Sequence, residues 1–256
     1  MFIKVYRLLF LSIFFISTFL FANNEQISVG IDEKLGDYLP KDAQFVNSDG
    51  DTVLLGDLIK KPTLLAMVYY ECPGICAPLL TEMGWLLGKV ELKPVEDFQI
   101  ITISIDHTET HEIAHRWKQN YFDQMKKKEN TNAWTFLTGD SVNIHKVTDA
   151  LGFYFRKEGE EFAHPGALMA ISPDGKISRY LLGVQFNPFD VKMALIDAES
   201  GKTNPTIAKV LQFCFSYDPE GRGYSLNVTR ISGVIVFGLL GIFLFGVVLR
   251  KKKSVS

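Results

Sequence analysis

The sequence predicts an α/β domain built around a parallel pair of strands, and three observations carry that prediction. Two continuous apolar runs, residues 63–70 and 98–105, are each followed by a segment with helical spacing. A strand, a helix and a second strand in this order form a crossover that makes the two strands parallel. The third observation is Glu71-Cys72-Pro73-Gly74-Ile75-Cys76, a cysteine pair at the junction between the first run and its helix.

The composition is that of a globular domain with apolar ends. The chain has 256 residues, of which 47% are hydrophobic, and a formal net charge of −2. Between the terminal apolar segments, roughly 200 residues remain, which suits one domain that buries a core without disulfide bonds. The near-neutral charge offers no electrostatic attraction to nucleic acid. Three cysteines are too few for a disulfide scaffold, and their odd number leaves at least one unpaired.

The first 22 residues have the pattern of a targeting segment. Lys4 and Arg7 precede an apolar run over residues 8–21, which has the length of a signal-peptide core and is short for a membrane span. Ala22 suits the position before a cleavage site, whereas Leu20 is bulky for its place near that site. We therefore expect a signal peptide over residues 1–22, with an uncleaved N-terminal anchor as the alternative.

The other end predicts a transmembrane helix. Residues 231–249 are a predominantly apolar run without a charged residue, followed by Arg250-Lys251-Lys252-Lys253. Such a run is long enough to cross the hydrocarbon core, and the basic residues favour the cytoplasmic side. We expect a transmembrane helix over 230–250 and a cytoplasmic tail over 251–256. The domain between the two ends would then be membrane-anchored and face the periplasm, where thiols meet oxidising conditions.

The first half of the domain contains a hairpin and two strand–helix pairs. An Asp49-Gly50 turn between two short strand-like segments is typical of a β-hairpin. Strands are predicted from continuous apolar runs, and helices from apolar residues that recur every three or four positions. These signals predict a hairpin over 44–55, a strand over 63–70, a helix over 78–90, a strand over 98–105 and a helix over 110–125.

The second half predicts another strand–helix pair, a second hairpin and a closing helix. After a charged loop over 126–132, the predicted elements are a strand over 134–137, a helix over 141–151, hairpin strands over 166–172 and 176–182, and a helix over 188–198. A crossover followed by a hairpin and a helix is the order of the thioredoxin-like fold, here with an added N-terminal β-hairpin. We assign 23–37 to a lead-in, 38–200 to this domain and 201–229 to a C-terminal extension.

The cysteine pair lies where a helix start would favour reactive sulfur. The free N–H groups and the positive dipole end of a helix stabilise thiolate, the form that attacks disulfides and binds soft metals. Cys72 and Cys76 either share one helical turn or flank a loop ahead of a helix that starts near Pro78. Pro73 and Gly74 favour the loop. Either arrangement lets two sulfurs converge on one ion, and a disulfide between them also remains open.

The candidate for a third ligand is His164, in Phe162-Ala163-His164-Pro165-Gly166, just ahead of the predicted strand 166–172. In a thioredoxin-like fold this loop runs beside the cysteine turn. Two thiolates and one imidazole suit a soft monovalent copper ion, and they can also hold copper(II). A single histidine before proline is otherwise an ordinary loop residue. Together with the cysteine pair, it predicts a copper site formed by Cys72, Cys76 and His164.

The same residues carry a resemblance to the SCO/SenC family of thioredoxin-fold, copper-binding assembly factors. The resemblance covers nearly all of residues 38–225, and the combination of the cysteine spacing with a downstream histidine is its most specific part. The matching stretches are Tyr69-Tyr70-Glu71-Cys72-Pro73-Gly74-Ile75-Cys76 and residues 53–58, 104–106, 136–140, 164–176, 178–183 and 214–219. The resemblance implies copper bound by Cys72, Cys76 and His164. It also implies a role in building the copper centre of a cytochrome c oxidase subunit, or in keeping that centre's cysteines reduced.

One stretch departs from the family pattern. After Ser104-Ile105-Asp106, the family usually continues with proline and an acidic turn, whereas this chain carries His107, His111 and His115. A second metal site there is one interpretation, and a solvated helix start is the other. Asp106 has two interpretations. It orients a ligand or a partner near the cysteine loop, or it closes a turn. Cys214, between two phenylalanines, is expected to be buried, with transient pairing to a partner as the alternative.

Two functions share the same sulfurs. The first is a copper metallochaperone that holds one ion through Cys72, Cys76 and His164. The second is a thiol–disulfide oxidoreductase in which Cys72 and Cys76 form a redox pair, so whether the protein is an enzyme stays open. The two functions differ at His164, because metal binding needs the imidazole and disulfide exchange does not. A membrane tether favours the chaperone, since it raises the local concentration near an integral-membrane oxidase.

Overall fold

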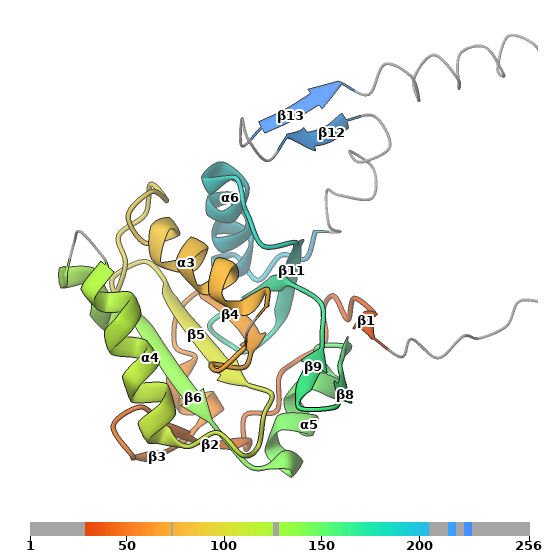
Figure 1. The fold of residues 1–256 in the computed structure, drawn as a ribbon. Coiled ribbons are helices and arrows are strands. Elements are labelled where there is room, and N and C mark those ends of the chain that lie inside the picture. The colour runs from red at the N-terminus through yellow and green to blue at the C-terminus, as the bar shows by residue number, and fades with distance from the viewer. Residues whose placement is uncertain (1–28, 73, 125–127, 205–214, 219–222, 227–256) are drawn as a thin grey trace, which may run out of the picture.

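The central sheet has seven strands in the order β11-β10-β4-β5-β6-β2-β3 (Figure 1). The computed structural model describes residues 29–72, 74–124, 128–204, 215–218 and 223–226. The strands of the sheet are β2 (Gln44–Asn47), β3 (Thr52–Leu54), β4 (Thr63–Val68), β5 (Gln99–Ser104), β6 (Trp134–Thr138), β10 (Ala167–Ile171) and β11 (Ile177–Leu182). Helices pack against this mixed sheet, so the predicted α/β class is confirmed.

The centre of the sheet is parallel, as predicted. β4 pairs with β5 from Thr63↔Gln99 to Val68↔Ser104, and β5 pairs in parallel with β6. Every residue of β4 is buried, which is expected of a strand covered on both faces. β10 runs antiparallel to β4, with Met169 opposite Leu65. The residues that precede β10 therefore lie at the same edge of the sheet as the residues that follow β4.

The predicted helices are present, with shifts at their ends. They are α3 (Cys76–Leu86), α4 (His111–Gln124), α5 (Ser141–Ala150) and α6 (Pro188–Glu199), and a four-residue helix, α2 (Leu55–Leu58), was not predicted. α3 and α4 contact each other, and α6 packs against β10, β11 and β4 (Figure 1). The Asp140 carboxylate caps α5 by accepting the N–H of Asn143, and the Asn187 side chain caps α6. These caps explain why both helices begin at the predicted residue.

The two predicted hairpins are confirmed, and several short strands were missed. β2 pairs with β3, and β10 with β11, around turns that contain Gly50 and Gly175, both at positive φ. The missed strands are β1 (Gly30–Ile31) with β7 (Phe153–Tyr154), and β8 (Arg156–Glu158) with β9 (Glu161–Ala163). A 3-10 helix (Lys128–Ala133) occupies part of the predicted charged loop. The missed strands are two or three residues long, so they give no periodic signal.

Both ends of the chain lie largely outside the described residues. The predicted signal peptide over 1–22, the transmembrane helix over 230–250 and Cys214 all fall there. Within the described segments, no helix combines the length and apolar character that a membrane crossing requires. In the predicted extension over 201–229, β12 (Phe215–Asp218) and β13 (Gly223–Leu226) form an antiparallel hairpin.

The Tyr70 hydroxyl links the parallel strands below the cysteine loop. It accepts the Leu137 N–H at 3.0 Å and lies 3.1 Å from the Thr102 carbonyl oxygen, to which it can donate. Tyr70 is almost completely buried, so removal of the hydroxyl would leave the Leu137 N–H without this acceptor. We expect Tyr70→Phe to lower the free energy of unfolding by about 1–3 kcal/mol, measured by urea denaturation. Tyr38→Phe, at an exposed tyrosine, is the matched control and should change it by less than about 0.5 kcal/mol.

Candidate metal centre

The fold brings Cys72, Cys76 and His164 together, as the sequence predicted. One potential ligand atom from each residue lies within 4.8 Å of the other two. The topology explains the encounter: the cysteines follow the end of β4, and His164 precedes the start of the antiparallel neighbour β10. In the part of the chain that the structure describes, this is the one cluster of three or more histidine, cysteine and acidic groups with metal-binding geometry.

The cysteine loop combines the two arrangements that the sequence left open. Cys72 lies in a turn after β4, and Cys76 is the first residue of α3, so the helix starts two residues earlier than predicted. The Gly74 N–H donates to the Cys72 sulfur at 3.3 Å, a bond made within the turn itself. Cys72 is partly exposed, whereas Cys76 is only 1% exposed. One sulfur is thus open to a partner and the other is closed off.

A hydrogen bond at Nδ1 orients the imidazole of His164. Nδ1 lies 3.1 Å from the Pro165 carbonyl oxygen, and Nε2 lies 3.1 Å from the Cys76 sulfur. A carbonyl oxygen only accepts hydrogen bonds, so Nδ1 carries the proton and Nε2 presents its lone pair to the sulfur. The rings of Tyr69 and Phe153 flank the imidazole, with centroids 5.8 and 6.3 Å away. Nε2 is therefore the nitrogen available to a metal.

Burial favours the neutral forms of Cys76 and His164 when no cation is present. It raises the pKa of the Cys76 thiol well above its ordinary value and lowers the pKa of His164. For Cys76, burial therefore acts against the thiolate form that a helix start favours. The Cys76 thiol can donate its proton to Nε2, and this proton must leave when a cation binds.

The donor set fits a soft metal. Two sulfurs and one imidazole nitrogen are ligands that copper(I) prefers, and three protein ligands leave a place for a donor from a partner. Cys72 and His164 are both partly exposed and provide the route of access, while Cys76 is buried in the apolar core. A cation at this position would be held at one edge of the sheet and reached from the outside.

The other histidines do not join this cluster. His115 Nδ1 lies 3.1 Å from the Ser48 carbonyl oxygen, and the His111 ring lies against Gly50, so both residues cover the β2–β3 turn. The interpretation of a second metal site among His107, His111 and His115 therefore finds no three-ligand group in the described residues. His145 stacks on Phe155 at 5.6 Å on the exposed side of α5.

Sequence reasoning missed two side chains that support the cysteine loop. Glu109, buried between β5 and α4, accepts hydrogen bonds from the backbone N–H groups of Tyr70 and Glu71. Burial raises its pKa, although these bonds and one from Ser104 act in the opposite direction. The Tyr69 hydroxyl hydrogen-bonds with Cys72, and burial together with that bond raises the pKa of Tyr69. Glu109 lies beyond the end of β5 at Ser104, and no local sequence signal distinguishes it from the neighbouring acids Asp106 and Glu112.

Asp106, which the sequence placed near the loop, closes a local turn instead. Its carboxylate accepts the N–H and the hydroxyl of Thr108, at 2.8 and 2.7 Å. This is the turn role that the sequence left open as an alternative to orienting a ligand. The neighbouring Glu109, three residues further on, makes the connection to the cysteine loop.

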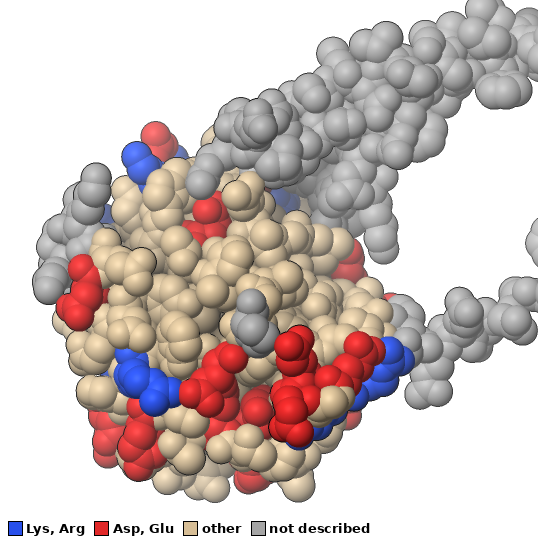
Figure 2. All heavy atoms as spheres, in the orientation of Figure 1, with Lys and Arg blue, Asp and Glu red and all other residues tan. Residues whose placement is uncertain are grey.

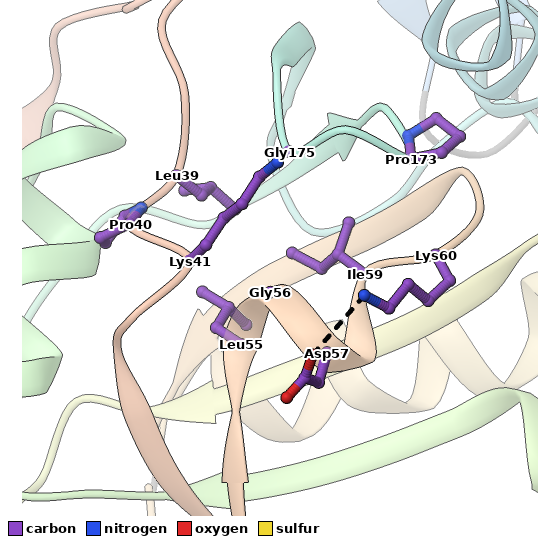
Figure 3. A pocket seen from close by; sticks show the side chains of 10 residues that line it. All are labelled: Leu39, Pro40, Lys41, Leu55, Gly56, Asp57, Ile59, Lys60, Pro173 and Gly175. Carbon is purple, nitrogen blue, oxygen red and sulfur yellow. Dashed lines mark ion pairs between the residues drawn. The ribbon is translucent and has the colours of Figure 1, made fainter.

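A surface pocket of about 210 Å³ lies away from the candidate metal centre (Figure 3). Its lining includes Lys41, Leu55 and Lys60, and Lys60 pairs with Asp57 at 3.6 Å. Lys60 precedes the start of β4, whereas Cys72 follows its end, so the pocket and the metal centre lie at opposite ends of this strand. None of the three candidate ligands lines the pocket.

The surface around α3 is largely uncharged, and acidic side chains gather below it (Figure 2). Exposed α3 positions include Ala77, Pro78 and Thr81, and Ile75 at the helix start is 40% exposed. Exposed acids near the site include Glu71, which pairs with Arg116, and Glu158 and Glu161 of the β8–β9 hairpin. No basic stripe of the kind that binds nucleic acid follows this described face (Figure 2).

The fold and the site together define a thioredoxin-like domain with a thiol–imidazole centre at one edge of its sheet. The family model for SCO1/SenC matches residues 33–195, and the chain belongs to this family. A relative in Bacillus subtilis (strain 168), described as a SCO1 protein homolog, is 27% identical over 154 residues, which are 57% of this chain and 75% of the relative.

Among the solved structures that are similar to this chain, two illustrate the relationship. BsSco, described as a member of the Sco family of cytochrome c oxidase assembly proteins in which a disulfide switch was identified, is 25% identical. The match has a TM-score of 0.53 and covers 67% of this chain and 96% of that chain. Arabidopsis thaliana ScoI, solved with copper bound, is 19% identical with a TM-score of 0.52, over 64% of this chain and 97% of that chain. The thioredoxin-like fold is confirmed.

Proposed function

We propose that this protein is a copper metallochaperone that binds one copper ion through Cys72, Cys76 and His164 and delivers it to a copper centre of cytochrome c oxidase. One observation carries the proposal: three ligand atoms from distant parts of the sequence lie within 4.8 Å of one another. Two sulfurs and an imidazole select copper over hard cations such as magnesium or calcium. Membership of the SCO1/SenC family supports the same metal.

The three ligands have different parts in binding and release. Cys76 and His164 are held rigidly, by α3 and by the hydrogen bond from Nδ1 to the Pro165 carbonyl oxygen. Cys72 lies in the more exposed turn, so it is the ligand that can be exchanged for a donor of the partner. We infer that release of the cargo begins at Cys72, because this sulfur is both accessible and supported mainly by local contacts.

A second function rests on the same cysteines, which are both free. In this alternative, the Cys72 thiolate attacks a disulfide of an oxidase subunit and forms a mixed disulfide. The Cys76 thiolate then attacks the Cys72 sulfur, which releases the second thiol of the partner and leaves a Cys72–Cys76 disulfide. Two electrons and two protons pass from this chain to the partner. The exposure of Cys72 beside a buried Cys76 favours this order of attack, and the disulfide switch identified in BsSco supports the alternative.

We place the domain outside the cytoplasm, attached to the membrane by the predicted helix over 230–250. The apolar run over 231–249 and the basic residues that follow it support this proposal. The predicted signal peptide over 1–22 would direct the domain to the periplasmic side. A tether there would keep the metal centre close to an integral-membrane oxidase. In this proposal the lead-in over 23–37 follows the signal peptide, and the extension over 201–229 connects the 38–200 domain to the membrane helix.

Copper titration of the full chain tests the proposal. Under reducing conditions, with a chromophoric chelator that competes for copper(I), we expect one ion per chain. Cys72→Ser and Cys76→Ser should each lose this stoichiometric binding, because each removes a thiolate ligand. Cys214→Ser is the matched control and should retain it. One tightly bound copper in the double variant Cys72→Ser/Cys76→Ser would contradict the proposal and direct attention to the histidines at 107, 111 and 115.

A further inference from the structure

Glu109 is a buried carboxylate that the proposed ligand set leaves unused. Its side chain lies in the segment between β5 and α4, and the residue is only 6% exposed. One carboxylate oxygen accepts the Tyr70 N–H at 2.9 Å and the Ser104 hydroxyl at 2.6 Å, and the other accepts the Glu71 N–H at 2.8 Å. All three donors are neutral groups, and no ion pair to Glu109 occurs among the described residues. Burial of an acid costs free energy, and these three hydrogen bonds offset part of that cost.

The two backbone groups that Glu109 binds are the last ones before Cys72. Pairing of β4 with β5 ends at Val68, whose carbonyl oxygen accepts the Ile105 N–H. Beyond this point the N–H groups of Tyr70 and Glu71 have no strand partner, and buried backbone donors require an acceptor. The Glu109 carboxylate provides it and directs the chain out of the sheet toward the cysteine turn.

The other restraints on Cys72 are local, and they include the hydrogen bond from the Tyr69 hydroxyl. The Cys72 N–H reaches the Tyr69 carbonyl oxygen only at 3.4 Å, and the bond from Gly74 lies within the turn. The ion pair between Glu71 and Arg116 is exposed and therefore weak. Cys76 and His164, by contrast, are fixed by a helix and by a ring hydrogen bond. The position of the exposed sulfur relative to the other two ligands therefore depends on the residues just before it.

We propose that Glu109 is a positioning residue that holds the 70–71 backbone and thereby sets the place of Cys72 in the metal centre. Ser104, at the end of β5, fixes the carboxylate in turn, since its hydroxyl donates to Glu109 and accepts the Asp106 N–H at 3.0 Å. The carboxylate thus links the ends of two parallel strands to the loop that carries the exposed ligand. The expected change in copper affinity rests on the proposed function, whereas the expected change in the reactivity of Cys72 does not.

Glu109→Gln tests the inference, because it keeps the size of the side chain but replaces one acceptor oxygen by an NH₂ group. That group cannot accept either backbone N–H, so the loop loses one of its two anchors. We expect copper(I) affinity to fall about 10- to 100-fold, as for other outer partners of metal ligands. In the metal-free chain, Cys72 should react several-fold faster with iodoacetamide, with the modified cysteine identified by mass spectrometry. Glu112→Gln, at an exposed acid three residues away, should change neither value.

The two measurements separate this inference from the proposed function. If the wild-type chain binds no copper, the proposed function fails, and the alkylation rate still tests Glu109. Wild-type copper affinity in Glu109→Gln, within about twofold, or an unchanged alkylation rate of Cys72 would overturn the inference. If Glu109→Gln does not fold, Ser104→Ala replaces it, because it removes one of the three hydrogen bonds. It should then change both values in the same direction by a smaller factor, and no change in either would overturn the inference.

Discussion

Replacing His164 by alanine should abolish tight copper binding and leave dithiol exchange intact. The imidazole Nε2 is the third ligand atom of the centre, 3.1 Å from the Cys76 sulfur. Loss of even an outer partner of a ligand costs roughly 10- to 100-fold in metal affinity, so loss of the ligand itself should cost more than about 100-fold. Exchange between Cys72 and Cys76 needs one attacking and one resolving sulfur and no histidine. Competition with a copper(I) chelator and reduction of a model disulfide measure the two properties separately.

His145→Ala is the matched control, because His145 lies on the exposed side of α5 and only stacks on Phe155. It should keep both copper binding and disulfide exchange. Tight copper binding by His164→Ala would show that the ligand set is wrong. Loss of exchange together with loss of copper would show instead that the imidazole serves the sulfurs, for example as the acceptor of the Cys76 proton.

The second large effect is expected at the buried ion pair between β11 and α6. Arg179 donates to the Asp197 carboxylate at 2.5 Å, and the two side chains are only 6% and 11% exposed. The remaining Arg179 donors, Nε and Nη1, have no hydrogen-bond partner within the described residues. Asp197→Ala would leave this cation buried and uncompensated. We expect the free energy of unfolding to fall by about 3–5 kcal/mol, measured by urea denaturation.

Two further variants determine whether the cause is the unpaired charge. Glu199→Ala removes an exposed carboxylate from the end of the same helix and should cost less than about 0.5 kcal/mol. The double variant Arg179→Met/Asp197→Leu replaces both charges by apolar groups of similar length and should recover most of the lost stability. A loss below about 1 kcal/mol in Asp197→Ala would contradict this account, because a buried unpaired charge is always costly.

Much of the fold was predictable because its signals are local. A run such as 63–70, apolar at nearly every position, is typical of a strand covered on both faces, and β4 is entirely buried. Asp140 and Asn187 mark helix starts through bonds to residues two or three positions away. The short β8–β9 hairpin was missed because each strand has three residues, which are too few to establish a period. Gly159, at positive φ in its turn, was the one local signal.

The start of α3 illustrates a limit of local reasoning. Pro73, Gly74 and Pro78 favoured a loop through the cysteines and a helix that begins near residue 78. The helix begins at Cys76, since Pro78 fits within the first turn, where its missing N–H costs nothing. Burial of Cys76 against the core then determines its protonation, a property that depends on neighbours from other strands.

By itself, the sequence determined the chemistry of this protein: two cysteines with three residues between them, a histidine before a proline, and the strand–helix order that carries them. Only the tertiary structure decided that Nε2 faces the Cys76 sulfur, that burial keeps this thiol protonated, and that Glu109 anchors the backbone before Cys72. The physical reason is the range of the interactions. Propensity and spacing act over a few residues, whereas desolvation and hydrogen bonding of buried groups depend on segments that only folding brings together.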